Sequence, residues 1–259
     1  VILGDQAHCY RWEAGGAAVL GSIQPQPLVQ DAEGRMDLDA IRAAVKPDDP
    51  HFARTRLLAL ENTWHGRVLD LDYIDAALAI AHDRGLATHL DGARLFNAAV
   101  ASHVPARDIA CRFDSVSVCF SKGLGAPAGS ALLGNDLLIA RARRIRKMLG
   151  GAMRQSGLLA AACHYALDHH VARLADDHAR AARLAEGLRE LGHDGVEQHT
   201  NMVFLPWPRE RQHALAEHLA AQRIRILAGY GPSLRLVTHL DVDDKGIAST
   251  LEAFRNFPM

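Results

Sequence analysis

The sequence predicts an α/β protein in which a large domain with a mostly parallel β-sheet precedes a small C-terminal α+β domain. The first observation behind this prediction is that short apolar runs typical of buried strands alternate with longer segments of helical periodicity, most clearly in residues 17–90. The second is that crossovers of this length imply parallel strands with helices on both faces of the sheet. We assign residues 1–157 to the large domain, and residues 158–259 to linking helices and the small domain.

The expected elements of the large domain follow from these patterns. Strands are rich in leucine and valine, and helices carry apolar residues three or four positions apart. In chain order we expect a strand at residues 1–5, a helix at 37–45, strands at 56–60 and 86–90 separated by a helix at 71–82, a strand at 114–120 and a basic helix at 141–148.

The expected elements of the small domain begin with long helices. Residues 158–191 are rich in alanine and leucine, with arginine and glutamate on the opposite face. Beyond them we expect a strand at residues 201–205, a helix at 210–222, a strand at 233–238 and a last helix at 243–254.

Composition indicates an enzyme that acts on small molecules and argues against several other classes. The chain has 259 residues, 49% of them hydrophobic, and a formal net charge of −1. Such a balance argues against nucleic acid or an anionic membrane as a main partner. Apolar runs are too short to span a bilayer. Four widely spaced cysteines lack any CxxC pair and fifteen histidines lack ligand spacing, so we expect reduced thiols, a cytoplasmic protein and no metal site.

Lys122 is the first candidate for a catalytic residue. It follows the apolar run of residues 114–120 and opens a glycine-rich turn, Ser121-Lys122-Gly123-Leu124-Gly125. Burial at a strand end disfavours the ammonium form, so the amine can attack a carbonyl and hold a cofactor aldehyde as a Schiff base. Taken alone, a lysine in this position is more often an ordinary surface residue.

Asp91 and Arg94 end the preceding strand, in His89-Leu90-Asp91-Gly92-Ala93-Arg94. A buried carboxylate keeps the ring nitrogen of pyridoxal 5'-phosphate protonated, and an arginine near the next helix reaches the phenolic oxygen. Taken alone, Asp91 is equally well a helix N-cap. Because sites gather at the carboxyl ends of parallel strands, these residues together with Lys122 predict a pyridoxal phosphate site.

At this point the chain resembles the threonine aldolases of the β-eliminating lyase group, which have the aspartate aminotransferase fold (fold type I). The resemblance rests on five stretches that run in family order: residues 60–63 (LENT), 89–94 (HLDGAR), 121–130 (SKGLGAPAGS), 147–155 (KMLGGAMRQ) and 234–241 (LRLVTHLD). It implies cleavage of L-threonine, L-allo-threonine and related β-hydroxy-α-amino acids to glycine and an aldehyde. Another pyridoxal phosphate lyase or a transaminase, or a truncated non-catalytic homologue, remains the alternative.

The resemblance also assigns roles to His8 and to the stretch around Trp64. A family histidine at the place of His8 stacks on the cofactor ring, and Ser121 joins the cofactor-binding residues beside Lys122. The family continues Glu-Asn-Thr with histidine, where this chain has Trp64 and then His65. Either a local backbone change lets His65 serve as the general base, or Trp64 shapes a substrate pocket for a different aldehyde. Without the family context, His8 reads as a loop histidine bonded to backbone.

Two further arginines are expected at the substrate. Arg235 matches the family arginine that binds the substrate carboxylate, a bidentate task suited to guanidinium; otherwise it pairs with an acid at the edge of the core. Arg154 either lies at the site near Lys122 or the cofactor, or it belongs only to a helix C-cap that is followed by the first turn of the next helix. Arg94 is counted with the substrate-binding residues as well.

The resemblance finally bears on assembly and on the start of the chain. The family forms homotetramers, as dimers of dimers, with sites between subunits. A family segment with a Ser/Gly/Thr turn that binds the cofactor phosphate precedes the position of Val1. We therefore expect part of the large domain to be missing from this chain and cofactor binding to be weakened.

Overall fold

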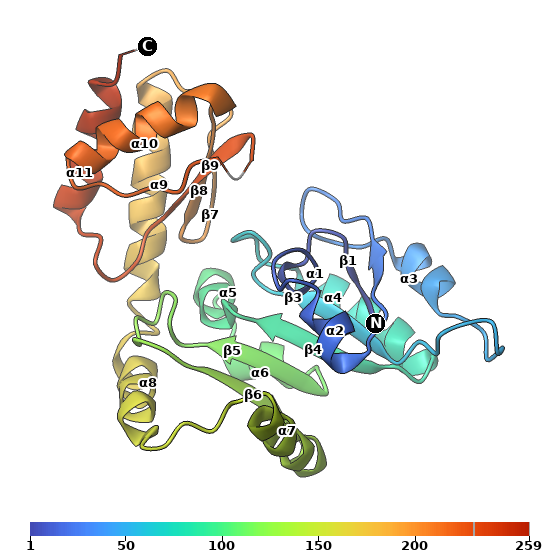
Figure 1. Ribbon diagram of the computed structural model, residues 1–259. Coiled ribbons are helices and arrows are strands. Elements are labelled where there is room, and N and C mark those ends of the chain that lie inside the picture. The colour runs from blue at the N-terminus through green and yellow to red at the C-terminus, as the bar shows by residue number, and fades with distance from the viewer. Residues whose placement is uncertain (230, 259) are drawn as a thin grey trace.

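A computed structural model describes residues 1–229 and 231–258 and confirms the expected α/β class (Figure 1). A six-stranded, mostly parallel sheet and a three-stranded antiparallel sheet each have their own hydrophobic core. The first core is built from residues between Ile2 and Leu174, and the second from residues beginning at Ala181. One helix, α9 (Leu174–Glu190), therefore contributes to both cores.

The large sheet has the order β2-β1-β3-β4-β5-β6. Its first five strands run parallel and only β6 is antiparallel to its neighbour. In chain order the strands are β1 (Ile2–Gly4), β2 (Gln26–Leu28), β3 (Leu57–Glu61), β4 (Ala87–Gly92), β5 (Ser115–Cys119) and β6 (Ser130–Gly134). The sequence patterns missed β2 and β6. Both are edge strands, and their side chains are less buried than those of the central strands. Pro27 is tolerated in β2 because an edge strand has no further neighbour to which its missing N–H would donate.

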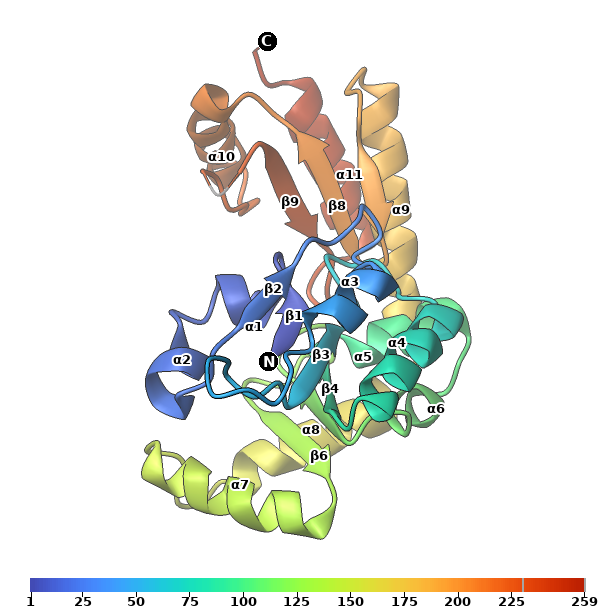
Figure 2. The ribbon, with the colours of Figure 1, turned by 90° about the vertical axis from the view of Figure 1, so that its right-hand side faces the viewer.

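Helices lie on both faces of this sheet, as expected. Figure 2 shows α3 and α4 on one side of the sheet and α1 and α2 on the other. In chain order the helices of the large part are α1 (His8–Arg11), α2 (Gly16–Gly21), α3 (Leu38–Ala44), α4 (Leu71–Asp83), α5 (Leu95–Ser102), α6 (Ala106–Ala110), α7 (Asp136–Met148) and α8 (Gly157–His169).

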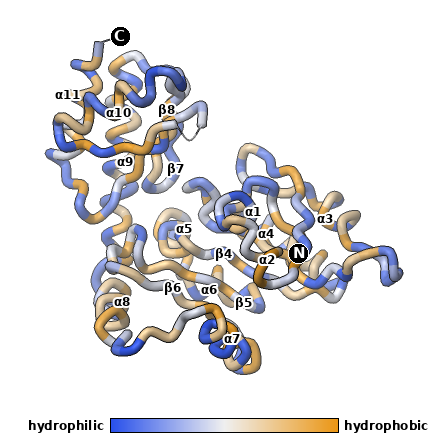
Figure 3. Tube along the Cα trace, viewed as in Figure 1, coloured by the Kyte–Doolittle hydropathy of each residue, from blue (hydrophilic) through white to orange (hydrophobic). Residues whose placement is uncertain are grey.

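The basic helix α7 begins five residues earlier than its run of basic residues suggested. Asn135 caps it, accepting a hydrogen bond of 2.9 Å from the N–H of Leu138. Figure 3 shows hydrophilic and hydrophobic residues together on this helix, and Leu137 and Met148 are about 80% exposed. The helix therefore carries an apolar face that the described chain does not cover. No helix within residues 1–229 and 231–258 is long and apolar enough to cross a membrane.

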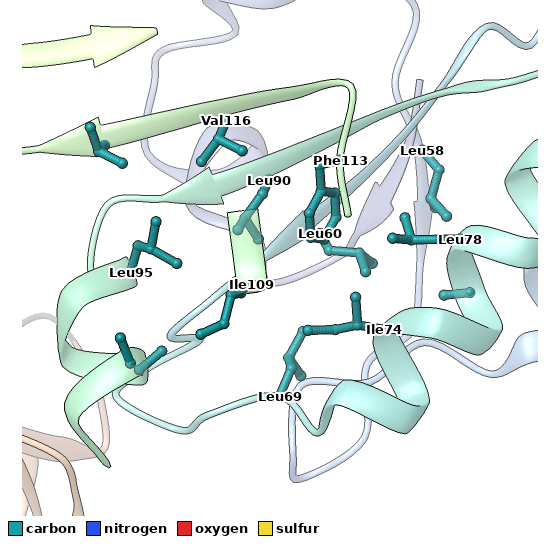
Figure 4. Packing of buried hydrophobic residues seen from close by; sticks show 14 of the residues in the cluster. Leu58, Leu60, Leu69, Ile74, Leu78, Leu90, Leu95, Ile109, Phe113 and Val116 are labelled. Atoms are coloured by element: carbon teal, nitrogen blue, oxygen red, sulfur yellow. The ribbon is translucent and has the colours of Figure 1, made fainter. Parts of the chain in front are cut away.

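The core of the large part fills the space between the sheet and its helices. Figure 4 shows Leu58, Leu60 and Leu90 of the strands facing Ile74 and Leu78 of α4. All five are at most 5% exposed. Burial of this kind contributes roughly 25 cal/mol per Å² of apolar surface. Buried residues alternate with more exposed ones along β3 and β4, and a strand turned over would lose this contribution, so burial fixes which side chains point toward the helices.

The small part packs α9 and α11 against an antiparallel sheet of order β7-β8-β9. Its elements are β7 (Glu197–His199), β8 (Met202–Pro206), the short 3₁₀ helix η1 (Arg209–Arg211), α10 (Gln212–Ala221), β9 (Ser233–Val237) and α11 (Asp244–Arg255). The sequence analysis missed β7, a three-residue strand without apolar side chains, because its pairing with β8 is all that marks it as a strand.

Candidate active site

The predicted residues lie at the carboxyl ends of three neighbouring parallel strands of the large sheet, β3, β4 and β5. Glu61 at the end of β3 stands opposite Asp91 on β4, which stands opposite Ser117 on β5. Lys122 follows the last residue of β5 by three positions. Because neighbouring strands lie about 4.8 Å apart, this register brings the two carboxylates and the lysine turn side by side. Glu61 and Asp91 are the last or nearly the last residues of their strands rather than lying beyond them.

The turn after β5 has a closed backbone. The N–H of Gly125 donates to the carbonyl of Lys122 at 2.9 Å, and the N–H of Ala126 donates to the carbonyl of Phe120 at 2.9 Å. Gly125 has a φ of 74°, a conformation that favours glycine. Ser121 is exposed, and its Oγ lies 3.3 Å from Sγ of Cys119. Lys122 is thus half-buried on a fixed turn, next to the serine that the sequence analysis placed with it.

Asp91 shapes the start of α5 without capping it. Its Oδ1 accepts a hydrogen bond of 3.0 Å from the N–H of Ala93, two residues on, whereas the N-cap of α5 is Arg94. The N-cap alternative for Asp91 therefore does not describe this carboxylate. One oxygen holds the local turn, and the half-buried group keeps further acceptor capacity at the strand end.

Arg94 presents a half-buried guanidinium to the same end of the sheet. Burial lowers the pKa of this group to about 10, with Arg235 acting in the same direction, while Glu61, Cys119 and Asp91 oppose the shift. Its Nε is buried and has no hydrogen-bond partner among residues 1–229 and 231–258. A buried N–H without an acceptor lowers the stability of the folded protein, so this group favours binding of a ligand that carries a hydrogen-bond acceptor.

Glu61 is a site residue to which the sequence analysis gave no role. Its carboxylate oxygen Oε2 accepts the N–H of His8 at 2.9 Å and ties β3 to the start of α1. Burial raises the pKa of Glu61 to about 7, and the charge of Asp91 adds to the rise, while the His8 N–H, Lys122 and Arg94 oppose it. The signals in the sequence were its position at the carboxyl end of β3 and its place in the stretch 60–63 that resembles the family.

Glu61 is expected to make the stability of the protein depend on pH. The pKa of Glu61 is higher in the folded than in the unfolded chain. The folded protein is therefore most stable at a pH where Glu61 is protonated in both the folded and the unfolded chain, and it loses stability as pH rises from about 4.5 to about 7. Glu61→Gln keeps an acceptor for the His8 N–H and removes this loss. At pH 8 the variant should be more stable by up to roughly 3 kcal/mol.

Urea unfolding of Glu61→Gln and the parent chain at pH 5 and pH 8 tests this expectation. Glu186→Gln, on the exposed face of α9, is the matched control. Equal differences between Glu61→Gln and the parent at both pH values would show that the carboxyl ionises alike in the folded and unfolded chain.

His8 opens α1 close to Glu61. Its backbone bonds to Glu61, and its imidazole Nε2 lies 3.0 Å from Oε1 of Glu13 with about half of the side chain exposed. The ring is therefore at the surface of the site and free to be covered by a flat group. His8 lies at the start of a helix, and its imidazole contacts the Glu13 carboxylate rather than a backbone group. Stacking of this ring on the cofactor stays a prediction.

Trp64 and His65 lie in a tight turn after β3. The N–H of Trp64 donates to the carbonyl of Arg67 at 2.9 Å, and the N–H of Arg67 donates back at 2.8 Å. His65 has a φ of 47°, in the left-handed region that non-glycine residues seldom adopt. Burial lowers the pKa of His65, followed by the charges of Arg235, Arg67, Arg94 and His8. Trp64 is buried beneath this turn with its ring edge-on to His65 at 4.6 Å between centroids.

Arg235 reaches the site from the small sheet. It stands on β9 opposite Phe204 of β8, is exposed, and its charge acts on both Arg94 and His65. No carboxylate within the described parts of the chain pairs with it, so the alternative of an ion pair at the core edge is absent there. A cavity of about 560 Å³ adjoins Arg235 between β9, residues 223–227 and α11. It does not extend to Lys122 or Asp91.

Arg154 is not brought to Lys122 in this structure. It lies in the exposed segment between α7 and α8, and none of the hydrogen bonds or ion pairs of the described residues joins it to the site. The structure matches the interpretation as a helix exit: α7 ends at Met148, Leu149 is its C-cap, and Gly150 has a φ of 85°.

The residues at the strand ends fit pyridoxal phosphate. A half-buried lysine amine, an aspartate with spare acceptor capacity and the orphaned Nε of Arg94 match the aldehyde, the ring nitrogen and the phenolic oxygen of that group. No group of three or more His, Cys, Asp or Glu in the described residues is arranged to hold a metal ion.

A parallel sheet that presents this lysine, carboxylate and arginine at its carboxyl ends defines a pyridoxal-phosphate-dependent enzyme of the aspartate aminotransferase fold type. The family model for β-eliminating lyases matches residues 1–207. The chain belongs to the β-eliminating lyase family. This assignment confirms the predicted resemblance and the predicted class, a lyase that uses pyridoxal phosphate.

Individual relatives and solved structures agree. The chain is 52% identical over 256 residues to the low specificity L-threonine aldolase of Escherichia coli strain K12, covering 99% of this chain and 76% of the relative. It is 39% identical to the probable low-specificity L-threonine aldolase 2 of Arabidopsis thaliana, covering 98% and 75%. The threonine aldolase structure of Leishmania major matches the fold with a TM-score of 0.80 at 21% identity, covering 98% and 76%.

Proposed function

We propose that this protein cleaves L-threonine, L-allo-threonine and related β-hydroxy-α-amino acids to glycine and an aldehyde, with pyridoxal phosphate as cofactor. The observation that carries the proposal is the meeting of Lys122, Asp91 and Arg94 at the carboxyl ends of β4 and β5 in a chain of this family. The relatives of known name are low-specificity L-threonine aldolases, which supports the same substrates here.

The residues of the large sheet would hold the cofactor. Lys122 supplies the amine that binds the aldehyde, Asp91 accepts the ring N–H, Arg94 donates from Nε to the phenolic oxygen, and His8 and Ser121 border the ring. When bound, pyridoxal phosphate supplies an electron sink for the bond that breaks. These residues all lie within residues 1–157, the proposed large domain, and Arg235 of the small part would complete the site.

Arg235 would hold the substrate carboxylate. It is the exposed cation of β9 that faces Arg94, and no carboxylate of the described chain occupies it. A guanidinium binds a carboxylate through two parallel N–H···O bonds, which fixes the orientation of the amino acid. The bond between Cα and Cβ is thereby set in the direction that selects cleavage over other reactions.

His65 would accept the proton of the substrate hydroxyl. Burial and the three neighbouring guanidiniums lower its pKa below the ordinary 6.5, so the imidazole is neutral at pH 7 and able to accept a proton. Trp64 lies beneath His65 and supports the imidazole from the protein side. This arrangement favours the local backbone change over a pocket lined by Trp64.

His65→Gln is expected to lower kcat by about 10²- to 10⁴-fold, the usual contribution of a positioned base. Below the lowered pKa of His65 the parent enzyme should lose activity as the imidazole gains a proton, and the variant should lack this acidic limb. Rates of acetaldehyde release from L-threonine between pH 5 and pH 9 measure both effects. An acidic limb that persists in His65→Gln would assign the base to another residue.

Product analysis tests the proposed reaction as a whole. Purified protein with pyridoxal phosphate and L-threonine should release acetaldehyde and glycine in equal amounts. Ammonia with a keto acid would indicate another lyase or a transaminase of the same fold. Absence of any turnover, with pyridoxal phosphate bound to Lys122, would indicate a non-catalytic homologue.

Assembly and location complete the proposal. A homotetramer, as a dimer of dimers, is supported by the large apolar side chains exposed on neighbouring helices of the large part, among them Leu137, Met148 and Leu158. Sedimentation equilibrium tests it. A cytoplasmic location is supported by four cysteines that are all free, since reducing compartments keep thiols unpaired.

A further inference from the structure

The turn of residues 64–67 is rigid because it is closed from within. The two hydrogen bonds between Trp64 and Arg67 make it a two-residue hairpin whose tip is His65-Gly66. Both tip residues have positive φ, 47° and 82°, as such hairpins require. Its base is equally fixed: a Cβ placed on Gly34 would lie 2.6 Å from the Trp64 ring, so the indole packs directly on that backbone.

The tip of this turn is fastened to the small sheet. Thr200, in the bend between β7 and β8, donates its hydroxyl to the carbonyl of Gly66 at 2.9 Å. The side chain of Arg67, only 15% exposed, pairs with Glu197 of β7. A Cβ on Gly66 would lie 2.6 Å from the carbonyl oxygen of His199, so the two backbones touch where glycine leaves room. These contacts join residues 130 or more positions apart.

The fastening fixes the position of His65 between the two parts of the protein. Its imidazole lies on one side against Trp64, of the large part, and on the other against Phe204 of β8, with centroids 4.6 and 6.2 Å away. Phe204 stands directly opposite Arg235 in the register of β8 and β9. A shift of the small sheet relative to the turn would therefore move Arg235 away from His65 and Arg94 together.

We propose that the Trp64–Arg67 turn and the β7–β8 bend form an interdomain latch, in which Thr200 and Glu197 are positioning residues that set the spacing between His65 and Arg235. The latch itself follows from the contacts, whereas its effect on turnover rests on the proposed function. Thr200 and Glu197 act through their contacts with Gly66 and Arg67.

Thr200→Val tests the latch without changing a charge. Valine has the shape of threonine but no hydroxyl, so the bond to Gly66 is lost while every charge near His65 remains: Arg235, Arg67, Arg94 and His8. In the full chain with pyridoxal phosphate, we expect kcat/KM for L-threonine to fall about tenfold, mainly through KM, as expected for one lost hydrogen bond. Thr200→Ser, which keeps the hydroxyl, should restore it.

The titration of His65 gives a readout that does not depend on turnover. NMR of histidine-labelled protein, assigned with His65→Gln, should show the midpoint of His65 in Thr200→Val moving up toward 6.5 as the imidazole gains contact with water. Glu197→Gln weakens the pair with Arg67 and should also move the midpoint: exposure of the imidazole raises it, and the charge of Arg67, no longer balanced, lowers it. Arg112→Met breaks a similar arginine–aspartate pair, to Asp75, remote from the turn, and should change neither midpoint nor KM.

Each outcome decides the proposal. If His65 titrates alike in the parent, Thr200→Val and Glu197→Gln, the contacts do not position it and the latch is overturned. If the midpoint moves while the parent releases no acetaldehyde, the latch stands and the proposed function fails. Should Thr200→Val fold poorly by circular dichroism, Glu197→Gln alone carries the same comparison.

Discussion

Replacing Lys122 with alanine is expected to abolish covalent attachment of pyridoxal phosphate and to lower threonine cleavage by on the order of 10³-fold or more. No other lysine of the described residues lies at the carboxyl ends of β3, β4 and β5, so no second amine can take its place. Because Lys122 stands on a turn closed by Gly125 and Ala126, its side chain can be removed without changing the backbone there.

Borohydride reduction followed by intact mass measurement tests this expectation directly. The parent should gain one reduced pyridoxyl phosphate group per chain, that is, the mass of the cofactor less one oxygen atom, and Lys122→Ala should gain none. Mass analysis of a digest should find the label on the peptide that contains Lys122. Lys245→Ala, on the exposed start of α11, is the control and should behave as the parent does. Retention of the label in Lys122→Ala would remove the cofactor role from this residue.

Replacing Arg235 with methionine is expected to lower kcat/KM for L-threonine by about 100-fold, chiefly by raising KM. Two charge-assisted hydrogen bonds to the substrate carboxylate are lost, each of which contributes more than a neutral one. Arg235→Lys keeps the charge but loses the planar pair of donors, so it should recover only part of the loss. Arg255→Met, which breaks an exposed pair within α11, should leave KM unchanged.

Arg235→Met has a second expected effect, on the pH profile. Arg235 is the charge that contributes most to lowering the pKa of His65, so its removal should raise that pKa and move the acidic limb of activity to higher pH. In Arg235→Lys the limb should stay near its original place. A fall in kcat/KM without any movement of the limb in Arg235→Met would mean that Arg235 and His65 do not share one site.

Much of the fold follows from local patterns in the sequence. The helices α3, α4 and α11 were expected within a residue or two of where they lie, because their apolar residues recur at helical spacing and Asp37 and Asp243 accept hydrogen bonds from their first turns. The strands β3, β4 and β5 were expected because their buried residues form short apolar runs. The edge strands β2 and β6 were not, since β2 is only half-buried and β6 is mostly exposed, so neither has the buried apolar run that marks a strand.

From the sequence alone, Asp91 and Lys122 could be assigned to the carboxyl ends of two successive strands, with Arg94 three residues after Asp91, and parallel strands place such residues at the same end of the sheet. Only the tertiary structure decided the rest of the site. The pKa of Glu61 near 7 arises from burial, and the neutral imidazole of His65 arises from burial and from Arg235, which lies 170 positions away on another sheet. Desolvation and charge depend on distances across the folded chain, and residue spacing along the sequence does not contain them.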